Sequence, residues 1–143
     1  MSGSSETFVL RNDLAELGPL AEFVETFCAP LSPTPQDDMA MQLSLEEMVT
    51  NVINHGYADG RSHNFTVTLS ALPDRLVRAV ITDDAPPFDP LDRPPVDLSA
   101  PLFERAIGGL GVHLLKKLMD STHYEYRDGM NILTFERTFG RAR

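Results

Sequence analysis

One predicted helix, residues 36–55, constrains what this chain can fold into. Its apolar side chains recur with the period of a helix that buries one side in a core; they are Met41, Leu45, Met48 and Val52. Glu47, Asn51 and His55 stand four residues apart beside that stripe, and each such step advances about 40° around the axis. We therefore expect a carboxylate, an amide and an imidazole, partly buried, along the edge of a cleft. The alternative is a surface helix whose polar rim happens to hold these residues.

The size and charge of the chain limit its class. With 143 residues, 42% of them hydrophobic, it is expected to form one domain over residues 1–143 around one core. A net charge of −9, with no cluster of Lys and Arg, argues against nucleic acid or anionic membrane as a direct partner. The sequence has no apolar run of transmembrane length and no basic-then-apolar pattern near residue 1, and its single cysteine, Cys28, excludes an internal disulfide framework. The expected compartment is the cytoplasm, with Cys28 as a small core residue.

Hydrophobic periodicity and turn residues divide the rest of the chain. Residues 1–6 are small and polar and are expected to be disordered. Strands are predicted at 7–11, 65–70, 76–82, 121–127 and 130–139, and further helices at 14–27 and 112–119. Asp128-Gly129 predicts a two-residue hairpin, and Gly56 is expected at the C′ position of the central helix. This order predicts an α+β fold, a two-layer sandwich whose mixed, mostly antiparallel sheet carries its helices on one face.

A proline-rich segment and a glycine stretch interrupt this pattern. Residues 85–107 lack periodicity and hold six prolines, and such a segment inside a domain is usually functional or mobile. Gly108, Gly109 and Gly111 follow and open a helix, where free N–H groups and the helix dipole favour phosphate. Because no lysine completes a Walker loop, a tight loop entering a helix is the alternative.

Asp83 stands where a predicted buried strand ends. A carboxylate there can accept a hydrogen bond from an exocyclic amine such as that of adenine. A solvated turn formed with Asp84 is the alternative. On the central helix, the amide oxygen of Asn51 suits a Mg²⁺ ion that also holds nucleotide phosphates. The carboxylate of Glu47, one turn earlier, can orient or deprotonate an attacking hydroxyl.

Taken in order, these motifs resemble the GHKL ATPase superfamily, named for gyrase, the heat-shock ninety chaperone, histidine kinases and MutL. Within it, the sequence looks most like the small serine kinases that act as bacterial anti-sigma factors. The resemblance covers residues from about 7 to 138 and implies the Bergerat ATP-binding fold. The motifs that carry it are Glu47-Met48-Val49-Thr50-Asn51, His55-Gly56-Tyr57, Phe88-Asp89 after the strand-end Asp83, and Gly108-Gly109-Leu110-Gly111 leading to Leu118-Met119-Asp120.

The resemblance implies roles for individual residues. Glu47 matches the catalytic base, Asn51 the Mg²⁺ ligand, and Asp83 the carboxylate that binds the adenine amine. His55 matches the end of the same helix motif and is expected among the nucleotide-binding residues. The family's phosphate-binding glycines, beneath a lid of residues 85–107, are matched by Gly109 and Gly111, with Gly108 and Leu110 beside them.

Two further residues, one at each end of the lid, are candidates for contact with the nucleotide. Ala85 stands where the family usually has a glycine, which permits close approach of a ligand. We therefore expect a tighter pocket and weaker nucleotide binding. Arg105 matches no family motif cleanly, but its guanidinium suits a γ-phosphate.

These resemblances imply a function. The chain is expected to bind ATP with Mg²⁺ as an anti-sigma-factor-type serine/threonine protein kinase. Its substrate would be a serine of a STAS-domain antagonist in bacterial partner switching, a form of transcription regulation. Anti-sigma kinases of this kind commonly pair, so a homodimer is expected.

Two alternatives to this function stay open. One is a non-catalytic ATP-binding module that sequesters a sigma factor, a phosphatase or another partner. The other is the catalytic part of a histidine kinase. Against the latter we expect no helical phospho-acceptor domain before residue 7.

Overall fold

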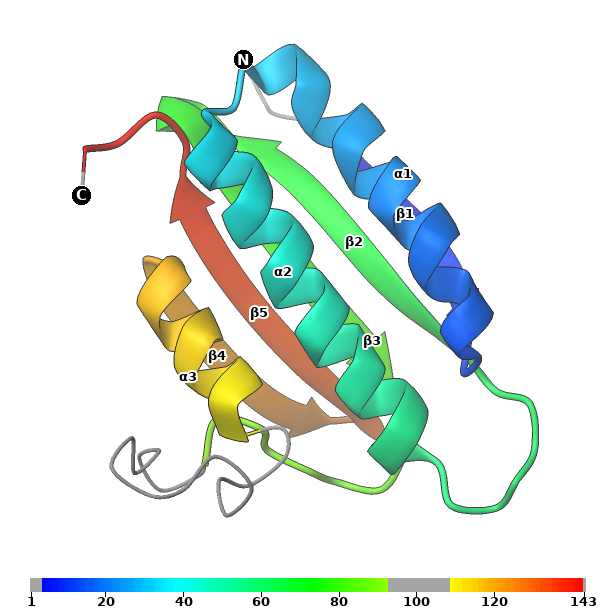
Figure 1. The fold of residues 1–143 in the computed structure, drawn as a ribbon. Coiled ribbons are helices and arrows are strands. Elements are labelled where there is room, and N and C mark those ends of the chain that lie inside the picture. Colours follow the sequence, from blue (N-terminus) through cyan, green and yellow to red (C-terminus); the bar gives the residue numbers. More distant parts are fainter. Residues whose placement is uncertain (1–3, 93–108, 143) are drawn as a thin grey trace.

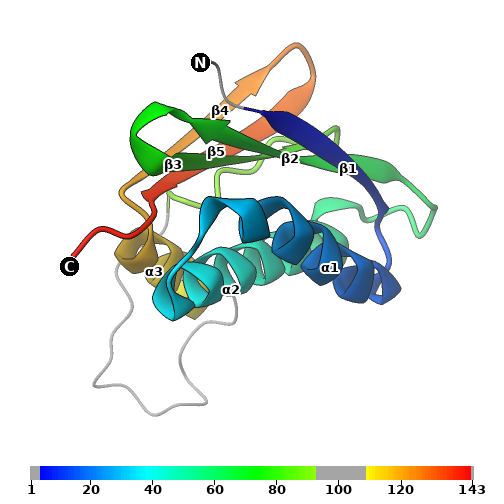
Figure 2. The ribbon, with the colours of Figure 1, turned by 90° about the horizontal axis from the view of Figure 1, so that it is seen from above.

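The computed structural model describes residues 4–92 and 109–142, and it arranges them as a sheet with three α-helices on one face (Figures 1 and 2). The strands are β1 (Ser5–Arg11), β2 (Asn64–Leu72), β3 (Leu76–Asp83), β4 (Ser121–Arg127) and β5 (Met130–Thr138). The α-helices are α1 (Leu17–Cys28), α2 (Pro35–Asn51) and α3 (Gly109–Leu118). This confirms the predicted α+β two-layer sandwich.

The five strands follow the order β1-β2-β3-β5-β4. We expected a mostly antiparallel sheet, and within the described ranges all four pairings are antiparallel. The connection through α3 makes β4 parallel to β3, but β5 lies between them and hydrogen-bonds to both. The predicted hairpin joins β4 to β5, and Asp128 and Gly129 both have positive φ, as a type I′ turn requires.

The N-terminal strand starts earlier than the sequence predicts. Ser5 and Glu6 belong to β1 and pair with Ser70 and Leu69 of β2. The hydroxyls of Ser5 and Ser70 are 2.6 Å apart and hydrogen-bonded. The expectation of disorder through residue 6 is therefore wrong for these two residues, because pairing with β2 orders them although their side chains are polar.

Helix α2 begins as its sequence predicts but ends differently. Thr34 and Asp37 form a capping box at its start. After Asn51 the chain continues as a π-helical turn, η3 (Val52–Gly56), and Gly56 does not have a positive φ. The predicted α-helical end at His55, with a left-handed Gly56, is wrong because the wider turn lets the chain leave the helix through Tyr57 in an extended conformation.

The core lies between the sheet and the helices. The predicted stripe of α2 packs into it, with Met41, Leu45 and Met48 at most 2% exposed and Val52 half-buried against them. Cys28 is buried too, as predicted, and burial, with the nearby Asp38 and Asp37 carboxylates, raises the pKa of its thiol to about 12. In the described ranges, no helix has the length and apolar character needed to cross a membrane.

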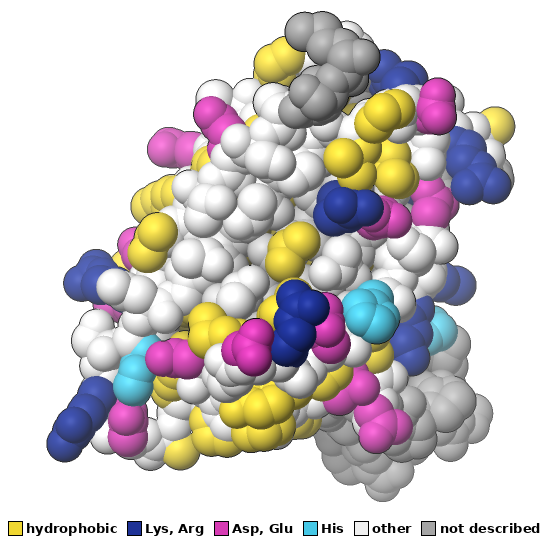
Figure 3. All heavy atoms as spheres, turned by 180° about the vertical axis from the view of Figure 1, so that it is seen from behind, with side chains coloured by type: hydrophobic (Ala, Val, Ile, Leu, Met, Phe, Trp, Pro, Cys, Tyr) yellow, Lys and Arg dark blue, Asp and Glu magenta, His cyan; other side chains and the backbone are white. Residues whose placement is uncertain are grey.

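No helix of residues 4–92 or 109–142 covers the opposite face of the sheet (Figure 2). Figure 3 shows this face, where acidic and basic side chains are interspersed. Thr7 and Thr68 share a hydrogen bond of 2.8 Å across β1 and β2, and Arg78 pairs with Glu136 at 2.6 Å across β3 and β5. Cross-strand pairs of this kind stabilise a solvated sheet face.

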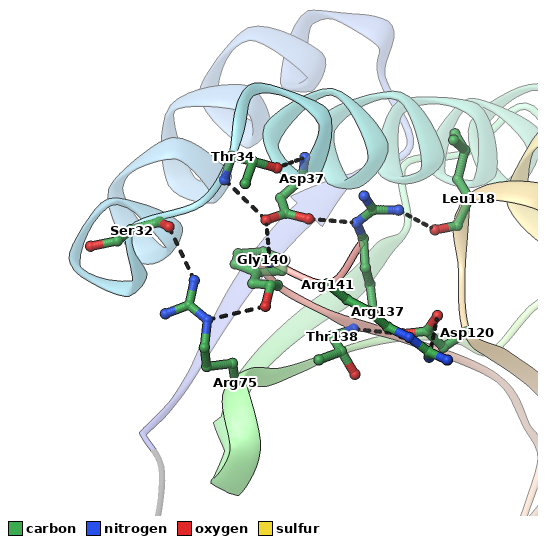
Figure 4. A network of polar contacts seen from close by, with 11 residues as sticks. Ser32, Thr34, Asp37, Arg75, Leu118, Asp120, Arg137, Thr138, Gly140 and Arg141 are labelled. Atoms are coloured by element: carbon green, nitrogen blue, oxygen red, sulfur yellow. Dashed lines mark hydrogen bonds and ion pairs between the residues drawn. The ribbon is translucent and has the colours of Figure 1, made fainter. Parts of the chain in front are cut away.

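A buried ion pair joins the start of α2 to the end of β5 (Figure 4). Arg137 Nε donates to Asp37 Oδ1 at 2.9 Å, and the two side chains are 4% and 1% exposed. Asp37 Oδ2 accepts from the backbone N–H groups of Thr34 and Gly140 at 3.0 and 2.8 Å. Arg137 also donates to the carbonyl of Leu118, the last residue of α3, at 2.7 Å. One pair thus connects α2, α3 and the sheet.

Removing the charge of Asp37 should destabilise the fold strongly at neutral pH. Asp37→Asn leaves the Arg137 guanidinium buried without a counter-charge, which costs about 3–5 kcal/mol of unfolding free energy. Burial opposes ionisation of Asp37, but hydrogen bonds from Thr34, Gly140 and Arg137 outweigh burial and lower its pKa below the ordinary 3.8. The stabilisation is therefore complete above pH 3.8 and is lost as the pH falls through the lowered value.

Urea unfolding from neutral to acid pH measures both effects. Asp38→Asn, in the same first turn of α2 but exposed, is the matched control and should change little. The difference in unfolding free energy between the wild type and Asp37→Asn should decrease below about pH 4. A difference that stays constant with pH, or an equal loss in the control, would contradict this account.

Candidate functional site

A pocket opens where β3 ends beside the last turn of α2. It encloses about 480 Å³, its open mouth included. Most of its wall is apolar, from Met48, Val52, Ile81, Phe88 and Leu133, with Gly56, Ala85, Pro86 and Pro90. Its polar groups are Asn51, His55, Asp83, Tyr124 and Asn131. An apolar wall with a few polar groups is typical of sites for flat organic ligands.

Asp83 is the buried carboxylate of this pocket, only 7% exposed. Its Oδ1 accepts from Asn131 Nδ2 at 2.9 Å and from the backbone N–H of Ala85 at 3.1 Å. Its Oδ2 has no hydrogen-bond partner among the described residues and is left to accept from a ligand. Burial raises the pKa of Asp83, while these two hydrogen bonds oppose the rise. The solvated turn considered from the sequence does not form here.

Asn131 on β5 holds the far side of the pocket, and it was not among the site residues predicted from the sequence. Its Nδ2 donates to Asp83 and also to the carbonyls of Ala85 and Pro86, at 3.0 and 3.1 Å. Its Oδ1 accepts from the backbone of Phe88 at 3.0 Å and from the Tyr124 hydroxyl. An inward-facing Asn in a strand whose other inward residues are mostly apolar was the available signal. The hydrogen-bond partners of Asn131 could not be predicted, because they depend on the strand register that places Asn131 opposite Asp83.

Asn51 and His55 enter the pocket from the helix side. Asn51 is half-buried, and its side chain makes no hydrogen bond within the described part of the chain. His55 follows in the π-helical turn and is exposed at the pocket wall. The expectation that all three polar residues of this helix are partly buried is therefore wrong for His55, because the wider turn takes it out of the α-helical row.

Glu47 lies one turn before Asn51 and faces the first turn of α3. A Cβ placed on Gly111 would come within 2.6 Å of Glu47 Oε2 and 3.3 Å of Glu47 Cβ. The φ angle of Gly111 is not positive, so close approach and not backbone conformation explains this glycine. The Glu47 carboxylate has no hydrogen-bond or ion-pair partner in the described ranges. It does not line the pocket, but it stands beside the helix start where the predicted phosphate site would lie.

Ala85 fits its position without strain. It is buried, its φ is not positive, and its methyl group faces Gly56, whose added Cβ would lie 3.5 Å away. This backbone position therefore does not require glycine, and the effect of Ala85 is confined to the width of the pocket.

Beside the pocket, Asp84 is held by an aromatic stack. Tyr57 donates to Asp84 Oδ1 at 2.7 Å, and its ring lies on that of His63 with centroids 4.2 Å apart. His63 in turn pairs with Asp59 at 2.8 Å. These contacts tie the loop after α2 to the end of β3.

Residues 10–137 match the sequence profile of the family described as "Histidine kinase-like ATPase domain". The chain belongs to this family. The match covers the described α-helices, the pocket and nearly all of strands β2 to β5, but only the end of β1. It confirms the resemblance to the GHKL superfamily drawn from the motifs.

Curated relatives of this histidine kinase-like ATPase domain include bacterial kinases. Serine-protein kinase RsbW of Bacillus licheniformis is 28% identical over 97 residues, which are 64% of this chain and 60% of that protein. Serine/threonine-protein kinase BtrW of Bordetella bronchiseptica is 29% identical over 94 residues, 66% of each chain. The anti-sigma F factor of Bacillus licheniformis is 30% identical over 99 residues, 68% and 66%. The chain spans about three fifths of the length of RsbW.

A solved structure supports the fold of this ATPase domain. The RsbU and RsbW domains from Mycobacterium tuberculosis match with a TM-score of 0.71 at 16% identity, over 97% of this chain and 33% of that one. At this identity the likeness shows the shared fold alone.

The other predicted positions of the ATPase domain lie around the start of α3. Gly109 and Leu110 are the first residues of α3, which begins three residues before the predicted helix at 112. Arg105, Gly108 and most of the predicted lid fall outside the described residues. Across the described ranges no group of three His, Cys, Asp or Glu side chains could hold a metal alone. A cation here would need ligand atoms from elsewhere, such as phosphate oxygens.

The contact between Gly111 and Glu47 in this ATPase domain can be measured by a double-mutant cycle. A Cβ on residue 111 would overlap the Glu47 carboxylate. Gly111→Ala should therefore lower the free energy of unfolding by about 1 kcal/mol more in the wild type than in a Glu47→Ala background. Urea unfolding of the four proteins gives the coupling. Gly18→Ala in α1, where an added Cβ meets nothing within 4 Å, is the control and should not couple to Glu47. Strictly additive effects for Gly111 and Glu47 would show that the contact is absent.

Proposed function

We propose that this chain binds ATP with Mg²⁺ and transfers the γ-phosphoryl group to a serine of a STAS-domain protein in bacterial partner switching. The observation that carries the proposal is the pocket that Asp83 and Asn51 both line. Among the described residues, Asp83 Oδ2 and the Asn51 side chain have no hydrogen-bond partner, and Glu47 lies one helical turn before Asn51. The names of the relatives, serine-protein kinase and anti-sigma factor, support this choice among the activities of the family.

The adenine base would lie between the apolar walls of the pocket. Its exocyclic amine would donate to Asp83 Oδ2, the oxygen that has no partner among the described residues. The burial of Asp83 makes such a hydrogen bond strong, since water competes little. The side chains present therefore fit an adenine ring, with Ala85 narrowing the space beside Gly56.

Asn51 and the start of α3 would hold the Mg²⁺ and the phosphates. An amide oxygen is a ligand that Mg²⁺ accepts, and the ion would complete its coordination with phosphate oxygens and water. The N-terminus of α3 adds N–H groups and positive dipole, and Gly109 and Gly111 have no side chain to block a phosphate. Gly108, Leu110 and Arg105 are proposed for the same phosphate region, and His55 for the pocket mouth.

Glu47 would act on the substrate serine. Phosphoryl transfer is catalysed mainly by positioning and charge stabilisation, with a carboxylate to orient the attacking hydroxyl or take its proton. The Glu47 carboxylate is available because nothing in the described ranges pairs with it. The Glu47 side chain lies against Gly111 of α3, one turn before Asn51 on α2.

Phosphotransfer to a STAS-domain partner tests this proposal. With γ-labelled ATP and a purified STAS protein, Glu47→Gln should lower the transfer rate at least about 100-fold with little change in ATP affinity. Glu46→Gln, the exposed neighbour on α2, is the matched control and should transfer at the wild-type rate. Wild-type transfer by Glu47→Gln, or label on a histidine in place of serine, would contradict the proposal.

A second candidate is an ATP-binding module that sequesters a sigma factor or a phosphatase without turnover. The buried methyl of Ala85 favours it, because a narrowed pocket can shift the nucleotide away from Glu47. This candidate predicts ATP binding with no labelled STAS protein. In either case we propose that the chain acts as a homodimer.

A further inference from the structure

Helix α2 presents apolar side chains on two faces. Met41, Leu45 and Met48 face the core, as expected for a helix on a sheet. Met39 and Leu43, one turn apart, do not belong to that core, and Met39 is 52% exposed. The outer side of a surface helix is normally polar. An apolar pair there needs another explanation.

These residues line an open groove between α1 and α2, which lie side by side over the sheet (Figures 1 and 2). The groove is lined from α1 by Leu17, Leu20 and Ala21, and from α2 by Met39, Gln42, Leu43 and Glu46. Gln42 Nε2 donates to the carbonyl of Ala21 at 2.9 Å and so fixes the two helices at this spacing. None of the seven residues lines the nucleotide pocket.

The groove lies in the acidic part of the molecule. Residues 12–60, which contain α1 and α2, hold nine Asp and Glu residues and no Lys or Arg. The remaining residues hold twelve acidic and twelve basic residues, so this span accounts for the whole net charge of −9. By contrast, the open sheet face carries both signs (Figure 3).

Four of these acids are exposed around the groove. Glu46 forms part of its wall. Glu25 lies one helical turn after Ala21 on α1, and Asp38 lies one helical turn before Gln42 on α2. Glu22 follows Ala21 on α1. In the described part of the chain none of the four has an ion-pair partner. The groove is thus an apolar strip with an unpaired acidic rim.

We propose that the groove between α1 and α2 binds an amphipathic helix of a partner protein, with an apolar stripe and Lys or Arg on both sides of it. Apolar residues of the partner would cover Met39 and Leu43, and its cations would pair with the acidic rim. The acids repel nucleic acid and anionic membrane. Helix α1, with 12 residues, is about 18 Å long, so about three turns of partner helix match the groove. This proposal does not depend on nucleotide binding or phosphotransfer.

A fluorescein-labelled model peptide tests the groove directly. It is an 18-residue helix with Leu at positions i, i+3, i+4 and i+7 and Lys and Arg elsewhere; a second peptide has the same composition scrambled. Fluorescence anisotropy should show binding of the amphipathic peptide at least about tenfold tighter than of the scrambled one. Binding should weaken as salt is raised and should not change when ATP is added.

Variants locate the binding surface. Met39→Gln with Glu46→Lys should weaken the amphipathic peptide about tenfold, since it removes apolar contact and reverses a rim charge. Val9→Gln with Glu6→Lys makes the same changes at two exposed residues of β1 that do not line the groove, and it is the matched control. Circular dichroism melting checks that both variants are folded.

Three results would overturn the proposal. One is equal binding of the two peptides, which would indicate charge attraction alone. Another is equal weakening in the control variant, which would place the peptide elsewhere. The last is concentration-dependent self-association in sedimentation that Met39→Gln abolishes, because a second copy of the chain would then be the occupant of the groove.

Discussion

Asp37 accepts hydrogen bonds from the helix start it caps, from the chain after β5 and from Arg137, all in a space closed to solvent. Such a carboxylate is costly to bury alone and stabilising only when every partner is in place. The pair therefore fixes the first turn of α2 on the sheet and, through Leu118, the last turn of α3. Because a helix is stiff, this also fixes Asn51, 14 residues and about 21 Å further along α2.

The far end of α2 meets a second polar cluster. Asn131 ties the end of β3 to the segment that follows it, and it does so with both ends of its amide. Among the described residues, one oxygen of Asp83 is hydrogen-bonded and the other has no partner, in a pocket whose wall is mostly apolar. The two polar clusters have different consequences. The Asp37 cluster holds the helices in place, and the Asp83 cluster holds an acceptor ready for a ligand.

Periodicity predicted the elements that depend on local sequence. The core stripe of α2, the strands and the Asp128-Gly129 hairpin are examples, since each is specified within a few residues. The π-helical turn after Asn51 was not predictable, because its hydrogen-bond shift depends on how the chain leaves the helix. The Asp37–Arg137 pair joins residues 100 apart, and no spacing rule connects them.

The site, like the fold, could be predicted only where local sequence motifs specify it. The motif order indicated that Asn51, His55, Asp83 and Ala85 belong together, and the structure places all four on one pocket. The role of Asn131 depends on strand register, which sequence pattern alone does not supply. The glycine at 111 was expected to make room for phosphate, and a Cβ at this position would meet the Glu47 side chain.

The central claim is that the free oxygen of Asp83 binds the amine of adenine. Calorimetric titration with ATP, with and without Mg²⁺, tests it on the wild type and Asp83→Asn. Asn keeps an oxygen for Asn131 and Ala85 but replaces the free acceptor with a donor, so the fold should persist while ATP affinity falls at least about tenfold. Asp84→Asn, on the exposed neighbour, should bind ATP as the wild type does. Equal ATP affinity of Asp83→Asn and wild type, or no Mg²⁺-dependent binding by the wild type at millimolar ATP, would contradict the account.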